Sequence, residues 1–300
     1  MVWRIIFSPE DLDRIQLRPT LGPLAETVLA VSLLRCPDQS RTLLKEWRSQ
    51  VQDRMTLRMR PLVSLIPPGC QGVDLPTLTG ETDTIEQGVR ALLEVPREHL
   101  LVEMAYTNRF NRLSPAAWAL AEPGSRPDLA DATEAAYRDL VQPYWHRIRA
   151  SLHAEQAARR RMLAREGAGR LLASLQGPRI RWRAPALEIG MPNHVDMDLA
   201  GRGLALVPSM FVGSNPSLHE NPNDDDETPR LILPAADMNR SSVWERRRSP
   251  GRRWPPWSAG TGPRCWPAWR TAAPPPSWPT GPESRSPRPA STRRCCAARA

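Results

Sequence analysis

The sequence is poor in cysteine, and its few cysteines do not form a metal-binding or disulfide pattern. Cys36 and Cys70 are the only two in the first 245 residues, and no Cys-x-x-Cys pair occurs anywhere in the chain. A zinc site or a disulfide framework is therefore unsupported. The N-terminus lacks the layout of a signal peptide, and no apolar run approaches membrane-spanning length. We therefore expect a reduced, cytoplasmic protein with no membrane partner.

Motifs that carry catalysis or bind phosphate are also missing. The sequence has no Gly-x-Ser-x-Gly, no cysteine beside a histidine and no paired-carboxylate motif. Residues 167–170 read Gly-Ala-Gly-Arg, but they follow an expected helix, whereas phosphate-binding glycine loops follow strands. We therefore predict that the protein is not an enzyme and needs no cofactor. We assign no catalytic, cofactor-binding or metal-binding residue.

Residues 246–300, here called the tail, contain no Leu, Ile, Val, Met, Phe or Tyr, so they cannot build an apolar core. The tail holds 12 Arg, 12 Pro and 5 Trp but a single acid, Glu283, which gives it a charge of +11. Since the whole chain carries +9, residues 1–245, here called the body, carry −2. The basic charge therefore says nothing about the partners of the body. Such a composition predicts a disordered tail. Its Arg and Trp could bind nucleic acid weakly and without sequence preference, but we favour the interpretation that this charge is incidental.

A second interpretation fits the tail better, namely that it is a domain translated out of frame. When the last base of each codon joins the first two of the next, Cys265 before Trp266 must give Leu, and Trp266 before Pro267 must give Ala. The third bases are otherwise free, and G or C suits a chain with one lysine among 41 basic residues. One allowed string, TELAHRTGISLATASQHAAVLR, has apolar residues at helical spacing and a glycine between two short helices. This string resembles the helix-turn-helix of ArsR-type winged-helix repressors.

The body resembles the same regulators. The segments PLAETVLAVSLLR, PYWHRIRASLHAEQAARRRMLAREG, RIRWRAPALEI and GRGLALVPSMFV are similar to the long N-terminal region of a bacterial ArsR-type subgroup, over about residues 2–244. In that subgroup a region of unknown function precedes a C-terminal winged helix. The resemblance implies a DNA-binding transcriptional regulator: a homodimer that binds operator DNA and responds to an unknown effector.

The printed chain departs from this family because it has no winged helix. We therefore expect the DNA-reading domain to be lost, and its DNA-binding residues are unknown. The alternative is a stand-alone ligand-binding or protein-interaction domain with no DNA role.

The apolar pattern of the body predicts an α+β fold, with a mainly helical N-terminal region followed by a predominantly antiparallel sheet. After an opening strand at residues 2–7, helices are expected after Pro23 and at residues 41–55, 84–94, 96–106 and 128–163. Pro143 should kink or divide the last of these helices. Alternating patterns predict strands at residues 179–183, 186–189, 195–199, 203–212 and 230–233. The body should be a sensor or oligomerisation domain, with a disordered tail.

Two acidic groups in the body could hold a metal ion, and each has a simpler explanation. His194, Asp196 and Asp198 alternate along an expected strand, as metal ligands can, but a solvent-exposed strand face has the same period. Residues 224–227 are four consecutive acids that lack the glycine and terminal glutamate of an EF-hand loop. We favour a solvent face for the first group and an acidic loop for the second.

Basic groups on the expected long helix are also ambiguous. His146 and His153 lie two turns apart, and polar residues beside an apolar stripe explain them without a ligand. Residues 159–161 are three arginines that could contact phosphate. Because Glu155 and Glu166 lie nearby, we expect a solvated helix face instead.

Overall fold

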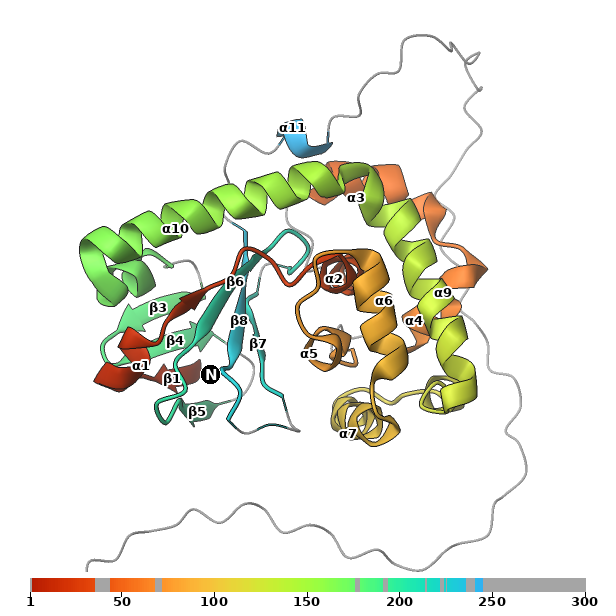
Figure 1. Ribbon diagram of the computed structural model, residues 1–300, viewed down its shortest axis with the longest axis horizontal. Coiled ribbons are helices and arrows are strands. Elements are labelled where there is room, and N and C mark those ends of the chain that lie inside the picture. Colours follow the sequence, from red (N-terminus) through yellow and green to blue (C-terminus); the bar gives the residue numbers. More distant parts are fainter. Residues whose placement is uncertain are drawn as a thin grey trace, which may run out of the picture. The chain divides into compact units, whose positions relative to one another are not determined.

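The structure, a computed structural model, describes residues 2–35, 44–67, 72–175, 179–190, 194–213, 215–221, 224, 226–235 and 241–244. These residues form helices and two small sheets, so the predicted α+β class is confirmed (Figure 1). The tail, residues 246–300, lies outside the described residues.

The strands form two four-stranded sheets. The first has the order β3-β4-β1-β5 and comprises β1 (Val2–Ile6), β3 (Ile180–Arg183), β4 (Ala186–Gly190) and β5 (Val195–Asp198). The second has the order β2-β6-β8-β7 and comprises β2 (Gln16–Leu17), β6 (Ala205–Ser209), β7 (Ser217–His219) and β8 (Arg230–Pro234). All strands expected in the second half of the body are present, although β6 spans only Ala205–Ser209 of the predicted residues 203–212.

Strand pairing is mixed, whereas we expected antiparallel pairing to predominate. The pairs β1–β4, β3–β4 and β7–β8 are antiparallel. The pairs β1–β5, β2–β6 and β6–β8 are parallel. The difference arises partly because β1 and β2, from the helical N-terminal region, join the sheets beside strands from the second half of the body.

One short helix lies between β1 and β2, and helices account for most of the described region between β2 and β3. They are α1 (Pro9–Asp13), α2 (Pro23–Arg35), α3 (Lys45–Val51), α4 (Arg60–Ser64), α5 (Leu75–Thr79), α6 (Ile85–Glu94), α7 (Arg97–Asn108), α8 (Pro115–Ala119), α9 (Arg126–Ala136) and α10 (Trp145–Ser174), with α11 (Ser241–Trp244) after β8. The predicted division at Pro143 is confirmed: a π-helical turn, Tyr137–Val141, and a 3-10 turn, Gln142–Tyr144, separate α9 from α10. Helix α3 ends at Val51 and continues as a 3-10 turn, Gln52–Arg54, whereas residues 41–43 of the predicted helix lie outside the described residues.

The apolar core has a helical part and a part against the sheets. Helix α2 lies at the centre of the helical part, where Ala30 and Val31 are fully buried, and α6 and α9 pack beside it. Helix α10 passes over the sheets (Figure 1), and its buried Leu171 and Leu172 belong to a cluster that includes Ile5. One apolar cluster among the helices and a second between α10 and the sheets thus hold the helices and strands in place.

A buried carboxylate joins the two parts of the core. Glu26, in α2, accepts hydrogen bonds from the hydroxyl of Ser209 at 3.1 Å and from the backbone N–H groups of Met210 and Phe211 at 3.2 and 3.3 Å. Burial raises the pKa of Glu26 to about 7, although these hydrogen bonds oppose the rise. Helix α2 is therefore tied to the segment that follows β6.

An aromatic cluster lies beside this contact. The ring of Phe211 packs on Trp47 with centroids 4.6 Å apart, and Trp244 of α11 packs on Tyr144 at 5.4 Å and on Phe211 at 6.0 Å. The indole of Trp47 also donates a hydrogen bond to the carbonyl of Leu140 at 2.9 Å. Residues from four distant segments thus meet in one cluster, which fixes the last described helix.

Candidate functional site

A cavity of about 500 Å³ lies between helices α2, α5 and α7 and strands β1, β5 and β7. Its apolar lining includes Trp3, Val28, Leu29, Ile66 and Met197. Its titratable side chains include Asp74, Glu103 and His219. A concave, mainly apolar surface with a few polar groups that lie close together is typical of a small-molecule site.

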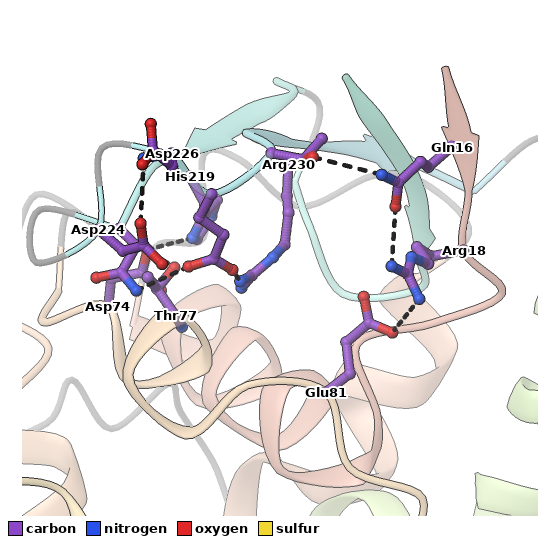
Figure 2. Close-up of polar contacts among 12 residues, drawn as sticks. Gln16, Arg18, Asp74, Thr77, Glu81, His219, Asp224, Asp226 and Arg230 are labelled. Carbon is purple, nitrogen blue, oxygen red and sulfur yellow. Dashed lines mark hydrogen bonds and ion pairs between the residues drawn. The ribbon is translucent and has the colours of Figure 1, made fainter. Parts of the chain in front are cut away.

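The side chains of Asp74 and His219 are paired by a short hydrogen bond in this cavity. Figure 2 shows their side chains pointing toward each other from the start of α5 and from β7. His219 Nδ1 donates to Asp74 Oδ2, and Asp74 also caps α5 by accepting hydrogen bonds from the backbone N–H of Thr77 at 3.1 Å and its hydroxyl at 2.7 Å. Burial opposes ionisation, but His219 and Thr77 outweigh it, so the pKa of Asp74 is lowered.

Ser217 extends this pair into a chain of three hydrogen-bonded side chains. It lies two residues before His219, so both side chains project from the same face of β7. Ser217 Oγ is 2.9 Å from His219 Nε2. Because Nδ1–H is donated to Asp74, Nε2 can accept the proton of the Ser217 hydroxyl. Serine, histidine and aspartate therefore stand in the order that activates a serine nucleophile.

Glu103, from α7, contributes a second carboxylate and is 5% exposed. Burial raises the pKa of Glu103 to about 7, and the negative charge of Asp74 adds to the rise. A hydrogen bond from the backbone N–H of Asp74 and the proximity of His219 oppose it. Glu103 therefore exchanges its proton near neutral pH.

Further polar contacts connect the strands to the helices beside the Asp74–His219 pair (Figure 2). Arg230 of β8 forms an ion pair with Glu227. Arg18, just after β2, donates to Gln16 at 2.8 Å and lies 3.6 Å from Glu81, which lies between α5 and α6. The Arg18–Glu81 contact links the second sheet to the segment that follows α5, whereas the Arg230–Glu227 pair stays between β8 and the loop before it.

The alternating group on β5 does not contribute to this arrangement. His194, Asp196 and Asp198 are exposed, and Asp196 accepts two hydrogen bonds from the guanidinium of Arg4 at 2.6 and 2.8 Å. Asp198 accepts one from the backbone N–H of Ala200 at 2.9 Å. Across the described part of the chain, no three metal-ligating side chains come together.

The acidic loop has a partly structural role. Glu227 pairs with Arg230 and accepts a hydrogen bond from the Asn221 amide at 2.7 Å. Asp224 accepts one from the backbone N–H of Asp226 at 3.1 Å, while residue 225 lies outside the described residues. The loop is thus held by its own side chains.

The expected solvated face of α10 is wrong at one position. His146, His153 and Arg161 are exposed. The side chain of Arg159, however, is 14% exposed and lies 2.6 Å from Glu155, whose side chain is 7% exposed. The reason is that this turn of α10 packs on β2, where Gln156 donates to the carbonyl of Leu17 at 2.7 Å.

Reasoning from the sequence missed every residue of the cavity site. Asp74 had one recognisable signal, because an aspartate two residues before a proline is typical of a helix start. Ser217 and His219 had the period of a strand. Asp74 and His219 are 145 positions apart in the sequence, which left no signal that the two side chains meet.

No known protein family, curated protein or solved structure matches the chain. Among the described helices, none combines the length and apolar character needed to cross a membrane.

Proposed function

We propose that the body is the effector-binding domain of an ArsR-like transcriptional regulator, and that a small-molecule effector occupies the cavity. The observation that carries this proposal is a cavity of about 500 Å³ that contains a buried Glu103 beside the Asp74–His219 pair. Burying titratable groups costs stability, and proteins commonly bear that cost at functional sites. The volume suits a small organic molecule.

Blocking the cavity tests this proposal. Ser32 of α2 lines the cavity, whereas Ser49 of α3 is exposed and lies outside its lining. Full-length wild type, Ser32→Trp and Ser49→Trp would be screened against small metabolites by thermal unfolding. A ligand at about a hundred times its Kd should raise Tm by roughly 5 °C in the wild type and Ser49→Trp. Equal stabilisation of Ser32→Trp, or no stabilising ligand, would contradict effector binding in the cavity.

The regulator part of the proposal is supported by the body's resemblance and by the helix-turn-helix string in the shifted frame. We infer that an intact relative acts in the cytoplasm as a homodimer that binds operator DNA. Restoring one or two bases near codons 245–253 and selecting from random duplexes tests this. The product should select two half-sites about one DNA turn, or a multiple of it, apart. If no preferred sequence emerges, the alternative of a stand-alone ligand-binding domain replaces the regulator.

A second candidate function, ester hydrolysis, is favoured by the Ser217–His219–Asp74 chain. Ser217 Oγ would attack the ester carbonyl carbon while His219 Nε2 takes the hydroxyl proton. That proton would pass to the alcohol oxygen as the C–O bond breaks, and water would then release the acid by the same route. This candidate departs from our expectation that the protein is not an enzyme.

A fluorophosphonate probe distinguishes hydrolysis from simple binding. If the second candidate holds, the probe labels wild-type protein at Ser217 and does not label Ser217→Ala at that site. Labelling should be accompanied by turnover of p-nitrophenyl acetate that Ser217→Ala lacks. Absence of labelling in wild type would remove the hydrolytic candidate and leave effector binding untouched.

A further inference from the structure

Glu103 differs from the other charged side chains that line the cavity. Arg4 is paired with Asp196 at 2.6 Å, Arg202 lies 3.5 Å from Glu220, and His219 is paired with Asp74. Among the residues that the structure describes, Glu103 has no ion-pair partner. Its carboxylate receives a hydrogen bond from the backbone N–H of Asp74. Within the described part of the chain, this buried carboxylate of the cavity thus forms no ion pair with an arginine or lysine.

The surroundings of Glu103 suit a cation that carries an apolar group. Tyr106 lies one turn further along α7, and Phe110 follows after another turn. Their rings are in edge contact, with centroids 5.3 Å apart, and both line the cavity although they are 56% and 53% exposed. Trp3 adds a third aromatic ring from β1. Aromatic faces attract ammonium groups, and apolar walls accommodate hydrocarbon groups.

We propose that the cavity binds a small organic amine whose ammonium group pairs with Glu103 and whose apolar part lies against the cavity walls. This inference rests on the proposed effector-binding function and names the chemical class of the effector. A monocation supplies the missing partner of one buried carboxylate, whereas an anion would add a second unpaired negative charge. A neutral ligand would leave Glu103 as it is.

Calorimetry on the full-length chain tests this proposal with amines of increasing size, from butylamine to benzylamine and phenethylamine. The matched probes are benzyl alcohol, which is neutral, and benzoate, which is anionic. At pH 8 we expect the best amine to bind at least about tenfold more tightly than either matched probe. Glu103→Gln should weaken that amine by at least about tenfold, because a charged pair is lost. Glu98→Gln, an exposed change in the same helix, should not.

Proton release provides a second readout, which a merely structural role of Glu103 would not give. Pairing with an ammonium lowers the pKa of Glu103, so binding at pH 7 should release up to about half a proton. The release is measured as the difference in binding enthalpy between phosphate and MOPS buffers. It should vanish in Glu103→Gln and persist in Glu98→Gln.

The outcomes separate this inference from the proposed function. If none of the amines binds, or if amine binding survives Glu103→Gln unchanged, the amine class is wrong. The same conclusion follows if benzyl alcohol or benzoate binds as tightly as the best amine. Effector binding would still stand if another compound stabilises the wild type but not Ser32→Trp. If no compound does so, the proposed function itself fails.

Discussion

Burial holds the pKa of two carboxyl groups, those of Glu26 and Glu103, at about 7, but their surroundings differ. Glu26 is surrounded by donors from Ser209, Met210 and Phe211, so its role is to join α2 to the segment after β6. Glu103 faces a cavity. The number of protein donors around each carboxylate therefore separates a structural group from a candidate ligand-binding group.

The raised pKa of Glu26 predicts that acid stabilises this part of the core. The carboxyl group ionises near 4.5 when exposed and near 7 when folded, so the folded state binds an extra proton between these values. The resulting stabilisation is complete below pH 4.5 and is lost as pH rises to 7, on the order of 3 kcal/mol in all. Urea unfolding of wild type from pH 5 to 8 should show this decline.

Glu103 also has a raised pKa, so its titration lowers the free energy of unfolding over the same pH range. Substituting Glu26 separates the effect of Glu26 from that of Glu103. Glu26→Gln cannot ionise and should have a flatter stability profile between pH 5 and 8. Its stability at pH 5 should also be lower, since an amide accepts fewer backbone hydrogen bonds. Glu98→Gln is the control and should keep the wild-type slope. A wild-type slope in Glu26→Gln would refute the titration of Glu26 in this range.

Gly22 is required at the start of α2 for a steric reason. Its φ is +97°, and a Cβ there would overlap the backbone oxygen of Thr82. Gly80 also has a positive φ, +69°, but a Cβ there would meet no described atom within 4 Å. Gly80→Ala should therefore cost only its backbone strain, about 1–3 kcal/mol. Gly22→Ala should cost clearly more in urea unfolding, and equal costs would contradict the overlap.

At the residue scale, the sequence could predict the local role of a candidate-site residue but not its contacts with distant residues. The cap signal at Asp74 depends on neighbouring residues, so it can be read from the sequence. The pairing of Asp74 with His219 depends on the placement of β7 beside α5. That placement follows from packing between distant segments, which leaves no local pattern.

At the scale of elements, the sequence predicted the features that depend on neighbouring residues, such as where a helix begins or is interrupted. Pro143 divides the long helix because it has no backbone N–H to donate. Helix α6 begins after Thr84, within one residue of the expected start, because the Thr84 side chain caps it. Strand β7 was missed because three residues are too few to establish an alternating pattern. The parallel pairs were missed because side-chain alternation is the same in parallel and antiparallel strands. Strand direction is set by the whole chain.

Helix α11 gives a prediction that belongs to this scale. Trp244 is 1% exposed and joins the cluster with Phe211 and Tyr144, while its indole N–H has no hydrogen-bond partner among the described residues. Trp244→Ala should therefore destabilise the protein by about 3–5 kcal/mol. Trp244→Phe keeps an aromatic ring and loses no hydrogen bond, so it should cost much less. Similar losses in the two variants, measured by urea unfolding, would contradict ring packing as the cause.

At the scale of the whole molecule, two truncations test whether the body folds without the tail. Every described contact involves residues up to 244, and Trp244 closes the aromatic cluster. The fragment 1–245 keeps this residue and should unfold cooperatively within about 2 °C of the full chain, because the tail has too few apolar side chains to contribute a core. The fragment 1–240 lacks α11 and should unfold several degrees lower. A lower Tm for fragment 1–245 as well would mean that residues 246–300 pack on the body, which would contradict the out-of-frame interpretation.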